Sequence, residues 1–387
     1  MGTWIQGTAQ RWLVLELTDS PFHVGVLGAV AGLPIMLFAF YGGMLADRLP
    51  RITFLLRVQG VILLQALLFG ILVDAGVINF YQILFLAFLL GGGMSFEVPA
   101  RQALVFDLTG TADITNALAL HSSIFNLARF AGPAIAGLLM AAGRDAWCFY
   151  SKAVSAMVII VCLMKIRSMH PEYDVHGGGN ADSSARGNPL ASFRETLEYL
   201  KSVPILVHVL LVVMMFGVLL LPYSVLLPSL GRDVLGLGAR EYGFLGASNG
   251  LGALAAAVFV AFLGRPENRQ RWWWTGTVLF PVSIMLFAVS RNYSEAMAAL
   301  FASGFVMVLT STSAISLIQI NAADSMRGRL MGLFSMCFMG FFPVGSILQG
   351  WVAGLAGVRT TLFSFALAAL LILLFAAFAI RFFKKDA

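Results

Sequence analysis

Composition places this chain in a membrane. It has 387 residues, of which 59% are hydrophobic and 11% are charged, and its mean hydropathy is +0.87. A soluble globular protein carries about 25% charged residues, so the composition excludes an ordinary soluble domain and indicates a polytopic membrane protein. The formal charge of +6 does not indicate a nucleic-acid partner. The basic residues follow the ends of apolar segments, whereas a nucleic-acid binder gathers them on a solvated face.

Sequence motifs for catalysis, cofactors and metals are missing. No Gly-x-x-x-x-Gly-Lys-Ser/Thr loop occurs, so ATP is not the direct energy source. No Gly-x-Ser-x-Gly elbow occurs either. The five histidines and three cysteines lack the spacing of metal ligands. We therefore expect a protein that is not an enzyme and that holds no cofactor and no metal.

The apolar segments, taken in chain order, predict about twelve transmembrane helices, the first of them short. The stretch from Met1 to Leu17 would rise about 25 Å, against a hydrocarbon core of ~30 Å, so we expect its start to be misplaced or the first helix to be truncated. The expected helices cover residues 2–18, 22–45, 52–74, 79–106, 113–141, 146–166, 204–229, 238–263, 272–290, 293–320, 327–354 and 357–382.

A polar segment divides these helices into two groups of six. Residues 168–192 are rich in Gly and Ser and predict a flexible linker. Residues 190–201 gather their Leu and Phe side chains on one face and predict an amphipathic surface helix. The expected organisation is an N-terminal six-helix bundle at 1–167, a cytoplasmic linker with its helix at 168–202, and a C-terminal six-helix bundle at 203–387.

Glycine spacing indicates that the two groups of six arose by duplication. Gly25, Gly28 and Gly32 recur 218 residues later as Gly243, Gly246 and Gly250. Parallel repeats of this kind are typical of transporters built from two similar halves. The spacing Gly28-x-x-x-Gly32 also favours close contact between helices, and packing alone explains most such glycines.

The distribution of basic residues predicts the orientation. Sixteen of the 25 Lys and Arg residues lie at the helix ends that share the side of residues 42–51, and six lie at the opposite ends. Basic residues concentrate on the cytoplasmic side of membrane proteins. We therefore expect a multi-pass protein of the cell (inner) membrane with both termini in the cytoplasm.

Residues 42–51 form the first dense patch of charge in the chain. Gly43, Asp47, Arg48 and Arg51 follow a pattern that resembles the signature loop between the second and third helices of the major facilitator superfamily. The resemblance implies an all-α polytopic fold of two pseudo-symmetric six-helix bundles. It also implies that an acidic residue at the cytoplasmic end of the fourth helix joins the charge network of the loop. Asp107 occupies that place, and Arg48 or Arg51 is its expected partner.

Four ionisable residues fall within the expected helices, where charge is costly and by default functional. Glu97 and Arg101 are spaced i, i+4, which favours an ion pair within one helix, and Pro99 can kink the helix so that both face a cavity. Arg129 is expected either to face the interior or to form a structural salt bridge with Glu97 or another group of the fourth expected helix. We expect Lys152 to extend to the membrane surface, since it lies under two turns from a helix end.

The fifth expected helix carries a second motif. Gly132, Pro133 and Gly137 are similar to the fifth-helix motif of drug–proton antiporters, although Ala119 and Ala128 fill its upstream glycine positions. Together with Arg327-Gly328-Arg329, this segment resembles a prokaryotic exporter branch of the superfamily that includes enterobactin exporters and macrolide-efflux-like proteins. The Arg-Gly-Arg stretch starts a helix, where cations are disfavoured, so lipid or carboxylate contacts are expected.

These resemblances imply a secondary active transporter that exports small amphipathic molecules, drug-like or siderophore-like, by alternating access and proton antiport. The expected partners are a small-molecule substrate, protons and membrane lipids, and we expect a monomer. Two alternatives remain open: an uptake facilitator of the same fold, and a non-transporting membrane sensor or scaffold. Charge inside the helices argues against a scaffold, which has no need to bury it.

Overall fold

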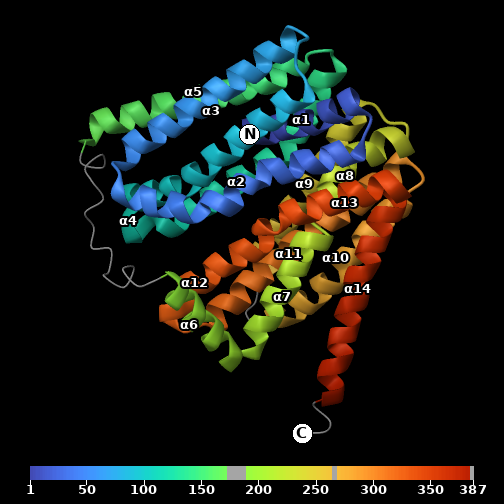
Figure 1. Ribbon diagram of the computed structural model, residues 1–387. Helices are drawn as coiled ribbons and strands as arrows, with labels where there is room; N and C mark the ends of the chain where they lie inside the picture. Colours follow the sequence, from blue (N-terminus) through green and yellow to red (C-terminus); the bar gives the residue numbers. More distant parts are fainter. Residues whose placement is uncertain (172–188, 264–267, 384–387) are drawn as a thin grey trace. The chain divides into compact units, whose positions relative to one another are not determined.

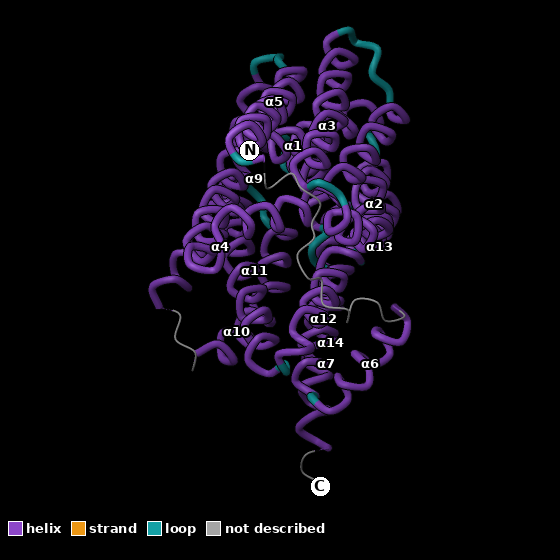
Figure 2. Tube along the Cα trace, turned by 90° about the vertical axis from the view of Figure 1, so that its left-hand side faces the viewer, coloured by secondary structure: helices purple, strands orange, loops and turns teal. Residues whose placement is uncertain are grey.

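The computed structural model describes residues 1–171, 189–263 and 268–383. Within these ranges every regular element is helical and there is no strand (Figures 1 and 2). Side chains are not described for residues 39–48, 110–112 and 376–383, nor for a few other helical positions.

The helices follow the expected segments closely at most boundaries. Their bounds are α1 Gly2–Thr18, α2 Pro21–Arg48, α3 Arg51–Asp74, α4 Phe80–Ala141, α5 Asp145–Met169, α6 Pro189–Ser202, α7 Pro204–Leu219, α8 Tyr223–Ser229, α9 Ala239–Leu263, α10 Arg269–Val289, α11 Tyr293–Asn321, α12 Asp324–Ser335, α13 Phe342–Ala356 and α14 Val358–Phe383. Two π-helical turns, Leu230–Val234 and Met336–Gly340, follow α8 and α12.

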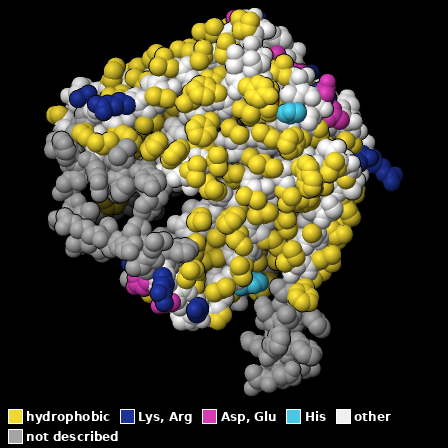
Figure 3. All heavy atoms as spheres, in the orientation of Figure 1, with side chains coloured by type: hydrophobic (Ala, Val, Ile, Leu, Met, Phe, Trp, Pro, Cys, Tyr) yellow, Lys and Arg dark blue, Asp and Glu magenta, His cyan; other side chains and the backbone are white. Residues whose placement is uncertain are grey.

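Eleven stretches of the described residues are long and apolar enough to cross a membrane. Helix α1 is not one of them, since it has 17 residues. The hydrophobic side chains that remain exposed are those expected to face lipid. On the face drawn in Figure 3 they predominate, and the Lys, Arg, Asp and Glu side chains gather at its margins.

The described chain falls into two compact units. The first comprises Met1–Asp19 with Val30–Gly187, and the second comprises Ser20–Ala29 with Asn188–Ala387. The first turns of α2 therefore pack with the second unit. Added Cβ atoms at Gly25 and Gly28 would approach Ser346 of α13, within 2.6 and 3.2 Å respectively. Gly25 thus lets α2 approach the backbone of α13, as small residues do in membranes, whereas Gly28 makes room for the side chains of Val225 and Ser346.

In the first unit, α4 differs from expectation. The sequence predicts two helices separated near residue 110, whereas the backbone is helical from Phe80 to Ala141. Neither Pro99 nor Pro133 ends it, although proline removes one backbone hydrogen bond from a helix. Two windows of α4 are long enough to span, Phe80–Thr109 and Leu120–Ala141. These two windows correspond to the two helices expected from the sequence.

The core of the first unit forms where α3 packs against α4 and α5. Figure 1 shows α3 beside α5. Phe69 of α3 and Phe149 of α5 stack with ring centroids 3.9 Å apart, and neither is exposed. Tyr150 lies against Gly70, where any side chain would collide with its ring. These contacts hold α3 and α5 in a fixed register.

The second unit contains α6–α14, and its interruptions were not predicted. The expected helix at 204–229 is divided into α7 and α8, and the expected helix at 327–354 is divided by the π-helical turn Met336–Gly340. Gly217 of α7 explains part of the second interruption, since a Cβ there would lie 2.6 Å from the carbonyl oxygen of Cys337. In the π-helical turn, the carbonyl group of Cys337 lies against Gly217 of the neighbouring helix α7.

Helix α6 has an uneven amphipathic pattern. Thr196 and Leu200 are buried, while Leu197, expected on the same apolar face, is 42% exposed. Leu190 and Phe193 lie outside the residues whose side chains are described. Among the described residues of α6, Leu200 therefore follows the predicted apolar face and Leu197 departs from it.

Candidate functional site

An ion pair inside α4 is the centre of the candidate site. Arg101 Nη1 lies 3.2 Å from Glu97 Oε1. The Glu97 side chain is 8% exposed, whereas that of Arg101 is 41% exposed. One helical turn separates the two residues, so the helix itself brings them together. The carboxylate is thus held inside the unit by a guanidinium that reaches a more open surface.

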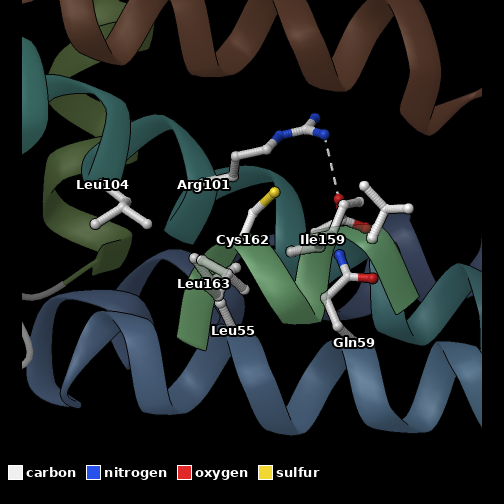
Figure 4. A pocket seen from close by; sticks show the side chains of 9 residues that line it. Leu55, Gln59, Arg101, Leu104, Ile159, Cys162 and Leu163 are labelled. Carbon is white, nitrogen blue, oxygen red and sulfur yellow. Dashed lines mark hydrogen bonds and ion pairs between the residues drawn. The ribbon is translucent and has the colours of Figure 1, made fainter. Parts of the chain in front are cut away.

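A cavity of about 170 Å³ adjoins this pair between α3, α4 and α5 (Figure 4). Most of its wall is apolar, with Arg101 extending across it and Gln59 entering it from α3. Gln59 is 1% exposed, and its Oε1 atom has no hydrogen-bond partner. The lining residues are Leu55, Gln59, Glu97, Arg101, Leu104, Val158, Ile159, Cys162 and Leu163. The cavity therefore combines apolar walls with a charged pair and an amide, as small-molecule sites do.

Lys152 of α5 is buried, and the expectation that it extends to the membrane surface is wrong. It is 4% exposed, and its Nζ donates a hydrogen bond to Thr3 Oγ1 of α1 at 3.0 Å. Close packing explains its position, since a Cβ added to Gly2 would lie 2.7 Å from the Lys152 Cα atom. The helices are too close there for the side chain to leave.

Arg129 and the second motif lie at the contact of α1 with the later part of α4. The Arg129 guanidinium lies over the Trp4 ring, 5.9 Å from its centroid, in a cation–π contact. Gly132 permits this approach, because a Cβ there would lie 2.5 Å from the Trp4 Cβ atom. Gly132, Pro133 and Gly137 are all buried. The motif therefore serves a close helix contact within the first unit.

The signature segment is only partly described. Arg51 at the start of α3 forms an ion pair with Asp107 of α4, and their side chains are 20% and 27% exposed. The backbone of α2 is helical to Arg48, so the expected loop is reduced to Leu49 and Pro50. The side chains of Gly43, Asp47 and Arg48 lie outside the described residues.

In the second unit, the Arg-Gly-Arg stretch contacts the linker helix. Arg329 Nη1 of α12 lies 2.6 Å from Glu195 Oε2 of α6, and the backbone N–H of Ala323 donates to the Tyr199 hydroxyl at 2.9 Å. A carboxylate thus offsets the cation near the start of α12. Arg327 takes a different role and donates to the carbonyl oxygen of Gln319.

Long apolar helices that bury a charged pair are typical of membrane transporters. Solved structures show the same fold: a crystal structure of a mutant form of the peptide transporter POT superposes with a TM-score of 0.72, covering 98% of this chain and 92% of that one at 13% identity. The expected all-helical major facilitator fold is confirmed. The fold and relatives are those of transporters and not of enzymes.

The family model described as transmembrane secretion effector matches residues 1–387, and the chain belongs to this family. The staphyloferrin A transporter of Staphylococcus aureus is 25% identical, over 93% of this chain and 88% of its own. The multidrug efflux pump Tap of Mycolicibacterium fortuitum is 25% identical, over 100% and 94%. The enterobactin exporter EntS of Shigella boydii is 24% identical, over 92% and 82%. The expected exporter branch is thereby confirmed.

Proposed function

We propose that this protein exports small amphipathic molecules, drug-like or siderophore-like, across the cytoplasmic membrane in exchange for protons. The match to a secretion family and to relatives named as an efflux pump and an enterobactin exporter supports export as the direction of transport. Bundles at 1–167 and 203–387, joined by the linker at 168–202, would alternate the access of a substrate site between the two sides. The basic-residue bias supports an orientation with both termini in the cytoplasm.

The observation that carries this proposal is the buried carboxylate of Glu97 beside an apolar cavity. An ionised carboxylate inside a membrane protein must be paired, and here Arg101 supplies the opposite charge at 3.2 Å. Proton binding to Glu97 removes the charge that holds Arg101. The guanidinium can then move toward the open side of the cavity, so the shape and polarity of the cavity depend on whether the proton is bound.

The cavity supplies apolar contact for part of a substrate. Its volume of about 170 Å³ is below the ~300–1,000 Å³ typical of drug-sized ligand sites. It therefore holds one apolar group of a larger molecule. Arg101 at its edge and Arg129 near Trp4 are the candidate polar contacts for the rest of the substrate.

Residues at the helix ends would control the alternation. Gly43, Asp47, Arg48 and Arg51 with Asp107 form the proposed gating network, in which the Arg51–Asp107 pair joins α3 to α4. Gly132, Pro133 and Gly137 let α4 approach α1 and bend. We propose that the protein acts as a monomer in contact with membrane lipids.

Reconstituted vesicles test this function. A panel of one cationic, one neutral and one anionic amphipathic dye is offered to vesicles that contain the protein and enclose the pH reporter pyranine. We expect at least one dye to cause proton movement opposite to its own, and Glu97→Gln to abolish the proton movement while dye binding persists. Glu16→Gln, an exposed carboxylate at the end of α1, is the matched control and should behave as wild type.

Each alternative outcome of the vesicle experiment indicates a different function or a different coupling residue. Dye movement without proton movement in the wild type would indicate a facilitator. No movement of any dye across the panel would favour a sensor or scaffold. Unchanged proton exchange in Glu97→Gln would place the coupling at another residue.

A further inference from the structure

Arg11 lies in the middle of α1. Seven residues separate it from Thr18, the last residue of the helix, which is about 10 Å along the helix axis. Side chains of a helix lean toward its N-terminus, and Arg11 Nη1 lies 3.9 Å from the position that a Cβ added to Gly7 would take. The guanidinium therefore lies a further turn inside the helix, away from its nearer end. A snorkelling arginine would extend the other way, toward the membrane surface.

Arg11 has no ion-pair partner in the described part of the chain. No hydrogen bond or ion pair joins its side chain to a described residue. Its Nε atom is covered and unpaired, whereas neither of its Nη atoms is among the covered unpaired atoms. Because Arg11 as a whole is half-buried, the two terminal nitrogens are the polar atoms that a ligand can reach. An arginine without a partner inside a membrane protein is costly, and such residues mark substrate or ion pathways.

The surface of α1 shows that this arginine does not face lipid. All side chains of α1 are described, and between Met1 and Leu17 no large apolar side chain is exposed. Helix α5, by contrast, exposes Val154, Val158 and Val161, as a helix in contact with acyl chains does. A lipid headgroup does not reach the site either, because the guanidinium lies ~15 Å from the end of the helix, well inside a core of ~30 Å. The half-buried side of α1 therefore lines a space that protein encloses.

Trp4, Gly7 and Arg11 share this side of α1, since they are spaced three and four residues apart. The Arg129 guanidinium lies 5.9 Å from the centroid of the Trp4 ring. The Phe125 ring, in a residue that is 49% exposed, meets the Trp4 ring edge-on with centroids 5.7 Å apart. Gly7 keeps the space between the two arginines open, because among described atoms a Cβ there would meet only Arg11 Nη1 within 4 Å. Two guanidinium groups and two aromatic rings thus lie on neighbouring turns of one surface.

We propose that Arg11 binds the acidic group of an amphipathic organic anion whose aromatic ring lies against Phe125. Such anions are then the substrate class of the exporter proposed above, on whose function this inference rests. A guanidinium matches the oxygens of an acidic group with paired donors, and Arg129 adds positive charge to the same surface. Glu97 is not part of this surface, so the anion and the proton bind at different residues.

Two probes of nearly the same shape test this substrate class. Anilinonaphthalene sulfonate carries an acidic group beside its rings, and phenylnaphthylamine has the same rings without that group. Equilibrium dialysis of the purified protein in detergent, with protein-free micelles as the blank, measures the binding of each. We expect the wild type to prefer the sulfonate. Arg11→Gln should weaken sulfonate binding at least about tenfold and change binding of the neutral probe less than about twofold, because only charged hydrogen bonds are lost.

Three other variants define the role of the guanidinium. Arg11→Lys keeps the charge without the paired donors, so its affinity for the sulfonate should be intermediate. Gly7→Leu fills the space beside Arg11 and should also weaken sulfonate binding. Arg57→Gln is the matched control, since Arg57 is an exposed arginine of α3, and it should leave both affinities unchanged.

Thermal unfolding separates a binding role of Arg11 from a structural one. An unpaired charge inside a membrane protein lowers its stability, so Arg11→Gln should melt at or above the wild-type temperature. A lower melting temperature, together with equal loss of both probes, would show that Arg11 holds the structure together and would refute the anion site.

The remaining outcomes are equally decisive. Unchanged sulfonate binding in Arg11→Gln refutes the anion site, and so does a wild type that binds neither probe or prefers the neutral one. Dialysis needs no proton gradient. If the vesicle experiment shows no proton exchange while the sulfonate preference depends on Arg11, the proposed antiport is refuted and the anion site stands.

Discussion

The contact of α9 with α11 predicts a large effect from one methyl group. Gly252 of α9 and Gly304 of α11 lie where the two backbones meet. A Cβ at Gly304 would fall well under 3.0 Å from the carbonyl oxygen of Asn249, and a Cβ at Gly252 would do the same at Phe301. Because the obstacle is backbone in both cases, it cannot move aside as a flexible side chain would. Gly304→Ala must therefore push the helices apart by about 1 Å.

The cost of that separation can be worked from its parts. Overpacking a tight contact costs about 1–3 kcal/mol. The separation also weakens the two hydrogen bonds of Asn249 Nδ2, to the Leu300 carbonyl at 3.2 Å and to Ser303 Oγ at 2.9 Å, which are worth about 0.6 kcal/mol each between membrane helices. Replacing glycine by alanine stabilises the helix by about 1 kcal/mol, because alanine has the higher helix propensity. The net loss of stability is about 2 kcal/mol, or roughly 4–8 °C in melting temperature.

Thermal unfolding of purified protein in detergent, followed by tryptophan fluorescence, measures this shift. Gly60→Ala is the control, since a Cβ at Gly60 of α3 meets nothing within 4 Å and only the helix propensity changes. We expect that control to melt at or above the wild-type temperature. A Gly304→Ala protein as stable as the wild type would show that α9 and α11 do not approach so closely, and the reasoning would be refuted.

Three further predictions concern the charged residues at the helix ends. Asp107→Asn removes the ion pair with Arg51 and should lower stability by about 1 kcal/mol, measured by thermal unfolding. High salt should destabilise the wild-type protein in the same direction, because it screens the pair. If salt has no such effect, the loss in the mutant is not electrostatic. Arg329→Gln should change the free energy of unfolding by no more than about 1 kcal/mol. It should increase the hydrogen exchange of the α6 backbone amides, because it breaks the ion pair with Glu195. Unchanged exchange would show that the pair does not hold α6 in place. Asp47→Asn should fold and insert normally yet transport poorly, and normal flux at matched expression would remove the signature segment from the mechanism.

Most of the fold could be predicted from hydropathy alone, because each span is a long apolar run bounded by charge or proline. Helix α3 begins at Arg51 and the prediction began at 52, and α9 begins at Ala239 against a predicted 238. The π-helical turn after α12 could not be predicted. The backbone of Cys337 packs against Gly217 at this turn, and the two residues lie 120 positions apart in the chain.

The candidate site was predictable only where its contacts are local. Glu97 and Arg101 are one helical turn apart, so their spacing reveals the pair. The position of Lys152 was predicted wrongly, because its partner Thr3 lies 149 residues away. The one available signal was the spacing of Thr3, Gln6 and Gln10, which places three polar side chains on the same face of α1.

The two units use their polar groups in different ways. In the helices of the second unit that were expected to cross the membrane, the Lys, Arg, Asp and Glu residues lie within two turns of an end or interruption. Asn249 and Ser303, the buried polar pair there, bond across α9 and α11 and so hold helices together. In the first unit, Glu97 lies several turns inside its span, and Lys152, under two turns into its span, is only 4% exposed. Burying a charged side chain lowers the stability of the protein, and the packing of helices does not need such a charge. Substitutions at Asn249 should therefore change mainly stability, whereas substitutions at Glu97 or Lys152 should change mainly transport.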